Sequence, residues 1–425
     1  MTLRDAGLFA LVGVLIVLTG LMQSWNLALQ VLNMGLISAI MALGVNLQWG
    51  FAGLFNVGVM GFVALGGLAV ALTAMPPVPE AWRAGGVGVI AALIVATITI
   101  VSAVIVWKKR APYRGVLIAL ILVVGFILYR WLFDPARDAI ESVNPALQGN
   151  LGGLGLPVVM AWPIGGVLAA GAAWLIGKTA LGLRSDYLAI ATLGIAEIIL
   201  AVMKNEDWLA RGVKNVIGVP SPLPTAIDLQ ESARFAARFA DPVTASTITV
   251  KLGYALMFTA VLLVLLALMQ LALRSPWGRM VRAIRDNETA AAAMGKNVTR
   301  RHLQIFILGS AICGLAGAMM TTLDGQLVPG TYQPLRFTFL IWVMVIVGGS
   351  GNNFGAVLGG MLIWFLWVQV EPVGQWLIGL LTQGLPDGGL KDHLLDSVAF
   401  MRLFTMGLAM LLVLRFSPRG LIPER

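Results

Sequence analysis

The residues of this chain that are best placed to do chemistry are polar side chains inside apolar runs. Glu197 stands eleven residues after Asp186 within such a run, and no basic residue lies three or four positions from it. A carboxylate inside a membrane is costly and usually faces a bundle interior or a water-filled cavity, so Glu197 is a candidate for a solute pathway. A hydrogen bond that holds two helices together is the alternative role.

Two amides flank a break in the apolar sequence closer to the amino terminus. Asn46 and Asn56 enclose Gly50 and Gly53, in a stretch too apolar for an open loop and too rich in glycine for a continuous helix. This pattern favours a half-helix or a re-entrant turn, which would expose backbone groups toward a cavity. Asn46, Gly53 and Asn56 are therefore further pathway candidates.

A second break follows the apolar run 337–347, where the sequence continues as GGSGNNFG over 348–355. Gly351, Gly355 and Gly359 recur every four residues, which would place them on one face of a helix if the helix persists there. Close packing between two helices explains such spacing. A broken helix beside a solute path is the alternative, and it makes Gly351 and Asn352 pathway candidates.

The segment 274–301 has the composition of a short helix outside the membrane. Asp286 or Asn287 can cap it, Glu288 lies in its first turn, four alanines follow, and Gly295 ends it. Alanine has high helix propensity and no bulk, so Ala290 and Ala291 would allow close approach to a groove on another protein. An ordinary basic loop with a helical kink is the alternative.

Other patterns that resemble active sites do not hold. Cys313 is the single cysteine, and His302 and His393 are the only histidines, so a cysteine or histidine metal site is not expected. The stretch GAAWLIGKT at 171–179 has five residues between its glycines, whereas a phosphate-binding loop has four. We therefore predict no catalytic residue, no metal and no cofactor.

The elements that position these residues are membrane helices. Hydrophobic residues make up 59% of the 425, charged residues only 12%, and the mean hydropathy is +0.89, so the chain is an integral membrane protein. Runs long enough to cross the hydrocarbon predict an all-α, polytopic fold of about twelve transmembrane helices with broken or re-entrant segments. The predicted spans are 8–24, 29–48, 53–74, 86–107, 115–133, 158–177, 186–204, 250–272, 303–323, 337–349, 355–371 and 398–415.

The net charge of +9 agrees with one orientation of these spans. If the amino terminus is cytoplasmic, the segments on that side hold 17 of the 29 basic residues and five of the 20 acidic ones. Cytoplasmic loops of membrane proteins carry an excess of Lys and Arg, so both termini and the 274–301 segment are predicted to be cytoplasmic. The charge is thus explained by topology, and nucleic acid is not an expected partner.

Two outer segments are too polar to span. Residues 134–157 contain turn sequences and are predicted to form an external loop. Residues 205–249 are predicted to form a second external loop, with a proline-rich part and a short amphipathic helix over 228–241 at the outer membrane face. A solvated loop that happens to be helical is an equal alternative for that helix.

Five blocks of the sequence, in order, resemble one known family. They are LISAIMALGVNLQWGFAGLFNVGVMGF at 36–62, LRSDYLAIATLGIAEII at 183–199, RSPWGRMVRAIRDNETAAAAMGKNVTRRHLQ at 274–304, VMVIVGGSGNNFGAVLGG at 343–360 and RFSPRGLIPER at 415–425. The chain resembles the permease subunits of ABC importers for branched-chain amino acids, the LivM type. The resemblance covers most of the chain outside 75–157.

The resemblance implies a single transmembrane permease domain over 1–425 in a bacterial inner membrane. It implies that 274–301 is a cytoplasmic coupling loop, in which Asp286, Glu288, Ala290, Ala291 and Gly295 engage an ATPase. The implied partners are a homologous second permease, two cytoplasmic ATP-binding subunits, a periplasmic solute-binding protein and membrane lipid. Permeases for urea and short amides are similar, and an ion-coupled secondary transporter using Glu197 is a more distant alternative.

The sequence departs from the family pattern at several places, among them the outer segment 210–215. Residues 76–157 form an insertion that is predicted to hold two extra helices and an external loop. Thr289 occupies the position at which the general permease pattern has Glu, and Val59 a position at which relatives often have His. The insertion adds an even number of crossings, so it preserves the predicted orientation of everything that follows.

Overall fold

The computed structural model describes residues 3–109, 113–145, 149–383 and 389–424. Within these residues, ten apolar helical segments are long enough to cross a membrane, and two shorter apolar helices accompany them. The long helices are α1 Leu3–Met22, α2 Trp25–Val45, α5 Val87–Lys108, α6 Arg114–Glu141, α7 Val158–Ala180, α8 Ser185–Asn205, α12 Pro242–Arg274, α15 Val298–Asp324, α17 Asn353–Leu381 and α19 Met401–Phe416, and the short ones are α3 Val59–Ala74 and α16 Pro334–Gly348. The all-α, polytopic prediction is confirmed.

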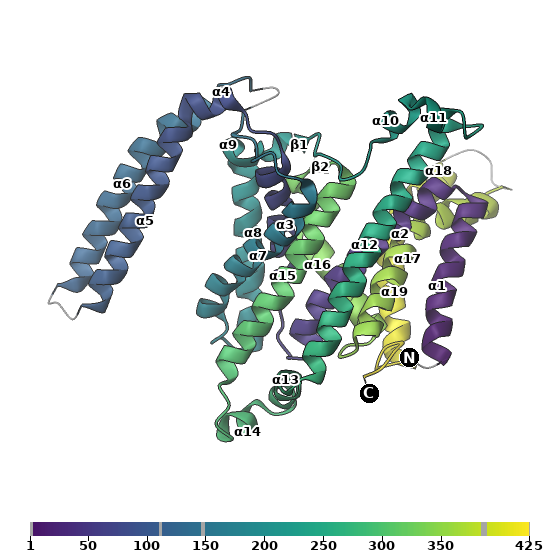
Figure 1. Cartoon of the computed structure of the whole chain (residues 1–425). Coiled ribbons are helices and arrows are strands. Elements are labelled where there is room, and N and C mark those ends of the chain that lie inside the picture. The colour runs from purple at the N-terminus through teal and green to yellow at the C-terminus, as the bar shows by residue number, and fades with distance from the viewer. Residues whose placement is uncertain (1–2, 110–112, 146–148, 384–388, 425) are drawn as a thin grey trace.

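The helices run back and forth between two ends of the molecule (Figure 1). The described ends of the chain lie together at one end, beside the short helices α13 Pro276–Asp286 and α14 Glu288–Ala293. The opposite end holds α9 Asp207–Ala210, α10 Ala226–Glu231, α11 Ala233–Ala236, and the two-residue strands β1 Val216–Ile217 and β2 Gln326–Leu327, which pair antiparallel. The termini and the 274–301 segment therefore share one side, as the charge distribution predicts.

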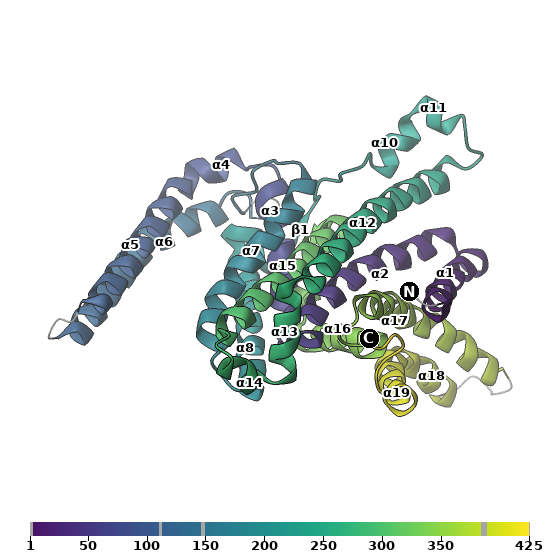
Figure 2. The same cartoon turned by 60° about the horizontal axis from the view of Figure 1, so that its bottom comes forward.

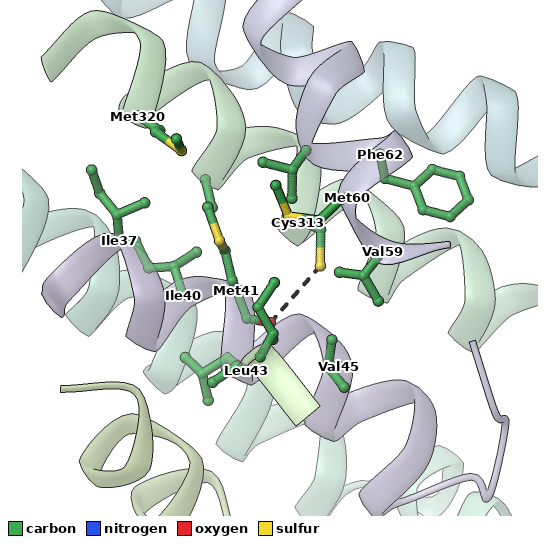
Figure 3. Packing of buried hydrophobic residues seen from close by; sticks show 14 of the residues in the cluster. Ile37, Ile40, Met41, Leu43, Val45, Val59, Met60, Phe62, Cys313 and Met320 are labelled. Carbon is green, nitrogen blue, oxygen red and sulfur yellow. Dashed lines mark hydrogen bonds between the residues drawn. The ribbon is translucent and has the colours of Figure 1, made fainter. Parts of the chain in front are cut away.

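The core of the bundle lies where α2, α3, α7 and α15 pack together, and small residues let these helices approach closely. A Cβ atom on Gly317 would overlap the carbonyl oxygen of Val63, so α15 and α3 touch backbone to backbone there. Cys313 lies among the buried side chains of this core, where its thiol points to the carbonyl oxygen of Met41, 3.8 Å away (Figure 3). The cysteine is thus a small packing residue.

The α5–α6 hairpin stands apart from the rest of the bundle in both views (Figures 1 and 2). Its own small core includes Ala92, Phe133 and Ile140, and its base is tied to the bundle by an edge-to-face contact of Phe133 with Trp208, with ring centroids 5.5 Å apart. Most of its large apolar side chains are exposed, as suits helices that face lipid. The two extra helices predicted for 76–157 are present.

Two details of the outer segments differ from the sequence predictions. Helix α6 continues to Glu141, so the predicted loop 134–157 is partly helical; Pro135 is accommodated inside the helix, and ion pairs such as Arg130–Asp134 at 2.9 Å lie around it. The predicted amphipathic helix over 228–241 is replaced by α10 and α11, which are interrupted at Ser232 with ψ 110°. The side chains of both short helices are at most partly buried.

The two predicted breaks are present. The last turn of α2 widens into a π-helical segment, Asn46–Gly50, and residues 53–58 have no regular secondary structure before α3 begins. Helix α16 ends at Gly348, and Gly349 and Gly351 take φ values of 121° and 79°, which only glycine adopts without strain. Gly355 and Gly359 on α17 pack closely against the backbone of α16, but Gly351 lies in the connecting loop and not on that helix face.

Candidate functional sites: an inner coupling segment and an outer charged groove

The predicted coupling segment consists of two short helices, α13 and α14. Asn287 caps α14, because its side-chain oxygen accepts a 2.9 Å hydrogen bond from the amide of Ala290. Asp286 is therefore not the cap; it ends α13 and pairs with Arg285 at 3.2 Å. Gly295 has φ 75° and donates to the carbonyl of Ala292, so it ends α14 as predicted.

The exposed surface of α14 is made of small side chains. Glu288, Ala290, Ala292 and Ala293 are exposed, and Met294 is 79% exposed at the end of the helix. Ala291 is instead buried within the chain, in a cluster with Ile284 and Val298. Of the two alanines predicted to meet another protein, Ala290 is thus accessible, whereas Ala291 holds α14 against α13 and α15.

Arg285 joins the coupling segment to the break after α2. Its guanidinium donates to the carbonyl oxygen of Gly50 at 2.6 Å and to the carboxylate of Glu424 at 2.9 Å. Burial by itself lowers the pKa of Arg285, but the hydrogen bond and charge of Glu424 raise it, with help from Asp286, so the net shift is upward. The residue remains charged and links three segments that are far apart in the sequence.

The candidates Asn46, Gly351 and Asn352 meet at this same inner junction. Asn46 is fully buried; its side chain donates to Asn353 at 3.2 Å and accepts from the amide of Gly351 at 2.9 Å. Asn352 caps α17 and donates to the carbonyl of Pro423 at 3.0 Å. These amides hold the π-helical end of α2, the 349–352 loop and the carboxy-terminal tail together.

Asn56 belongs to a second buried network, which is centred on Gln48 of the π-helical segment. Its side chain donates to Gln48 at 2.9 Å and accepts from the amide of Gly58 at 2.9 Å. Gln48 in turn donates to the carbonyl of Phe306 and to Ser310 on α15. The amide side chains at this break are therefore paired by hydrogen bonds, and the role of the break in a solute pathway stays a prediction. Gly53, with φ 70°, lies beside Arg285.

Glu197 lies elsewhere, in a groove of about 760 Å³. The groove is near the end of the bundle that is opposite the chain termini, which we call the outer end. The groove is formed by α8, α16 and α19, and its lining combines charged side chains with exposed apolar ones. The charged members are Glu197 and Lys204 on α8, Arg336 on α16 and Arg402 on α19. The structure thus separates Glu197 from the inner amides with which the sequence grouped it.

A second cavity of about 280 Å³ lies inside the chain, between α2, α3, α15, α16 and α17. Five methionines contribute to its lining: Met34, Met41, Met60, Met320 and Met344. Figure 3 shows three of these methionines on α2, α3 and α15. Flexible thioether side chains suit an apolar space of irregular shape. Among the described residues, no group of three or more His, Cys, Asp or Glu side chains could hold a metal ion.

These features define the class of protein: a polytopic helical membrane protein with a solute-sized groove and an exposed helical segment on one side. A family model described as the permease component of the branched-chain amino acid transport system matches residues 27–146 and 139–414. The chain belongs to this family, which confirms the resemblance seen in the sequence. The 171–179 stretch is continuous helix within α7 and not a phosphate-binding loop.

Three relatives illustrate the similarity. The high-affinity branched-chain amino acid transport system permease protein LivM of Escherichia coli K12 is 30% identical over 233 residues, which is 53% of each chain, and the protein of the same name in Salmonella typhimurium gives the same values. The probable branched-chain amino acid transport permease protein LivM of Methanocaldococcus jannaschii is 25% identical over 291 residues, 68% of this chain and 74% of that protein. The chain thus spans about half the length of the two bacterial relatives. No solved structure matches it.

Sequence reasoning did not identify Gln48, Arg285 or Arg336 as functional residues. Arg285 was one of seven basic residues in its segment, and nothing in the sequence separated it from the others. Arg336 did carry a signal, because it is an isolated charge at the start of the apolar run 337–347. Gln48 could not be recognised, because its partners Phe306 and Ser310 are about 260 residues away in the chain.

Proposed function

We propose that this chain is the membrane permease of an ATP-driven importer of branched-chain amino acids and forms half of the translocation pathway by alternating access. The observation that carries the proposal is the coupling segment: α14 exposes an alanine surface, and α13 is bonded through Arg285 to the break at Gly50. A displacement of α13 and α14 by an ATPase would thus be transmitted to the segment after α2 through the hydrogen bond from Arg285 to Gly50. Family membership supports the same role.

The proposed assembly contains two permeases, two ATPases and a solute-binding protein. The permease partner is a homologous subunit, the ATP-binding subunits dock on the cytoplasmic coupling segment, and the binding protein docks on the opposite, periplasmic side. The membrane is a bacterial inner membrane, and the distribution of basic residues supports this orientation. The exposed apolar surfaces of α5 and α6 then face lipid.

Uptake by the reconstituted assembly tests the cargo. The permease, with its proposed partner ATPases and binding protein, is placed in vesicles that contain ATP, and uptake of labelled leucine, isoleucine and valine is compared with uptake of urea and acetamide. We expect uptake of the three amino acids. Uptake of urea or acetamide alone would overturn the proposed cargo.

A Glu197→Gln variant in the same vesicles tests the ion-coupled alternative. Under the proposed function, any uptake that the variant retains still requires ATP and does not respond to a proton or sodium gradient. Uptake by the unaltered chain that follows an ion gradient, and that loses this dependence in Glu197→Gln, would favour secondary transport.

A further inference from the structure

We propose that the groove between α8, α16 and α19 receives the charged head of a hydrophobic amino acid, with Glu197 facing the α-ammonium group and Arg336 the α-carboxylate. This inference rests on the proposed function and assigns it a contact site.

The charges in the groove are not balanced within the chain. Among the described residues, neither Glu197 nor Lys204 on α8 forms a hydrogen bond or an ion pair with a side chain, and Arg336 on α16 forms no ion pair. Arg402 is different, because it pairs with Glu371. Glu197 and Arg336 are both exposed within the chain, so each is accessible to a partner of opposite charge from outside it, Glu197 to an ammonium and Arg336 to a carboxylate.

Aromatic rings hold the two arginines in place. The guanidinium carbon of Arg336 lies 5.2 Å from the ring centroid of Trp367 and 5.6 Å from that of Phe337. The guanidinium of Arg402 lies 5.9 Å from the centroid of Trp367. Stacking on a ring stabilises a guanidinium but leaves its N–H groups free to donate, so Arg336 is positioned and still able to bind a carboxylate with two hydrogen bonds.

The remaining wall of the groove suits an aliphatic side chain. Phe339 and Leu403 line it and are 52% and 58% exposed, and Leu335 and Phe400 lie beside them with similar or greater exposure. A solute with both charges at one end and an apolar group at the other can satisfy Glu197, Arg336 and this wall together. The groove volume of about 760 Å³ is within the range of small-molecule sites. A cargo without charges, such as urea, would leave both charges unpaired.

A cysteine placed in the groove tests the proposal. The single native cysteine, Cys313, is 1% exposed, so the thiol of a Phe339→Cys variant is the only accessible one on this chain. The full assembly without its binding protein is exposed to a charged methanethiosulfonate reagent from the outer side, and modification of this chain is followed with and without leucine. Leucinamide, which lacks the carboxylate, and 4-methyl-2-oxopentanoate, which lacks the ammonium, serve as matched probes.

We expect leucine to slow the modification and the two probes to protect far less. Adding Arg336→Gln should raise the leucine concentration that gives half protection by about tenfold or more, since one charge-assisted contact is lost. Glu197→Gln should have the same effect, whereas Arg238→Gln, an exposed outer arginine on another segment, should have none.

Three results would overturn the inference. One is equal protection by leucine in the presence and absence of Arg336 and Glu197. Another is protection by a zwitterionic phospholipid headgroup, glycerophosphoethanolamine, but not by leucine. The third is an unreactive Phe339→Cys thiol, which would mean that the second subunit covers the groove. ATP-driven leucine uptake by the unaltered assembly is measured in parallel. If this uptake is normal, any of the three results refutes the groove assignment but does not contradict the proposed function.

Discussion

Arg285 shows how one side chain can connect distant segments. It belongs to the coupling segment, but its strongest contacts are with Gly50 after α2 and Glu424 in the carboxy-terminal tail. Both acceptors are near the Asn46–Gly351 hydrogen bond. A movement of α13 would therefore displace the ends of α2, α16 and α17 that meet at this bond. A flexible basic loop would have no such connection.

Replacing Arg285 with Gln should separate ATP hydrolysis from transport. The variant loses the bonds to Gly50 and Glu424, and a hydrogen bond involving a charged group contributes about 1.5–3 kcal/mol. We therefore expect uptake to fall by about tenfold or more, while ATP hydrolysis by the reconstituted assembly continues. Arg279→Gln, an exposed change on the same helix, is the matched control and should transport normally. Equal uptake by the two variants would show that the contact of Arg285 plays no part in coupling.

At the scale of elements, the accessible surface of α14 is the feature to test. Ala290→Arg places a long charged side chain on an exposed position, so the chain should insert and fold normally but lose ATP-driven uptake. Ala6→Arg changes an exposed alanine of α1 at the same end of the molecule and should leave uptake unchanged. Normal uptake by Ala290→Arg would contradict the coupling role of α14. Ala291→Arg is a poorer probe, because Ala291 is buried against Ile284 and Val298.

The packing of α16 on α17 gives a second prediction at this scale. A methyl group on Gly359 would overlap the carbonyl oxygen of Met344, so Gly359→Ala should destabilise the protein by about 1–3 kcal/mol, the usual cost of overpacking. Gly379→Ala lies on the same helix with nothing within 4 Å and is the control. Thermal unfolding in detergent, followed by fluorescence, should give a lower Tm for the first variant only. Equal Tm values would contradict the prediction, because they would mean that α16 and α17 can move apart without a loss of stability.

The elements themselves were largely predictable, and their contacts were not. An apolar run marks each of the ten long helical segments and the two shorter apolar helices, because membrane helices must satisfy their backbone groups internally and therefore stand out in hydropathy. The glycines and amides around 46–58 and 348–355 located both breaks. What these amides bind could not be predicted, because the Asn46–Asn353 and Gln48–Ser310 hydrogen bonds join positions about 300 residues and 260 residues apart. The ends of α6 and α12 were also missed, since polar residues continue the helices beyond the hydrocarbon.

At the scale of the whole molecule, the two ends of the bundle should face different compartments. Met294→Cys and Glu231→Cys each add one exposed thiol, directly after α14 and at the end of α10, to a chain whose native cysteine is buried. In right-side-out vesicles an impermeant maleimide should modify Glu231→Cys, and Met294→Cys should react only after the membrane is opened. Modification of both thiols from the outside would contradict the orientation derived from the basic residues.

The proposed function requires that ATP drives this permease through α13 and α14. The most direct measurement is leucine uptake into vesicles that contain the complete assembly, with ATP and ion gradients supplied separately. We predict uptake when ATP and the binding protein are both present, with no change when proton and sodium gradients are collapsed. Uptake that proceeds without ATP and stops when an ion gradient is removed would contradict the claim.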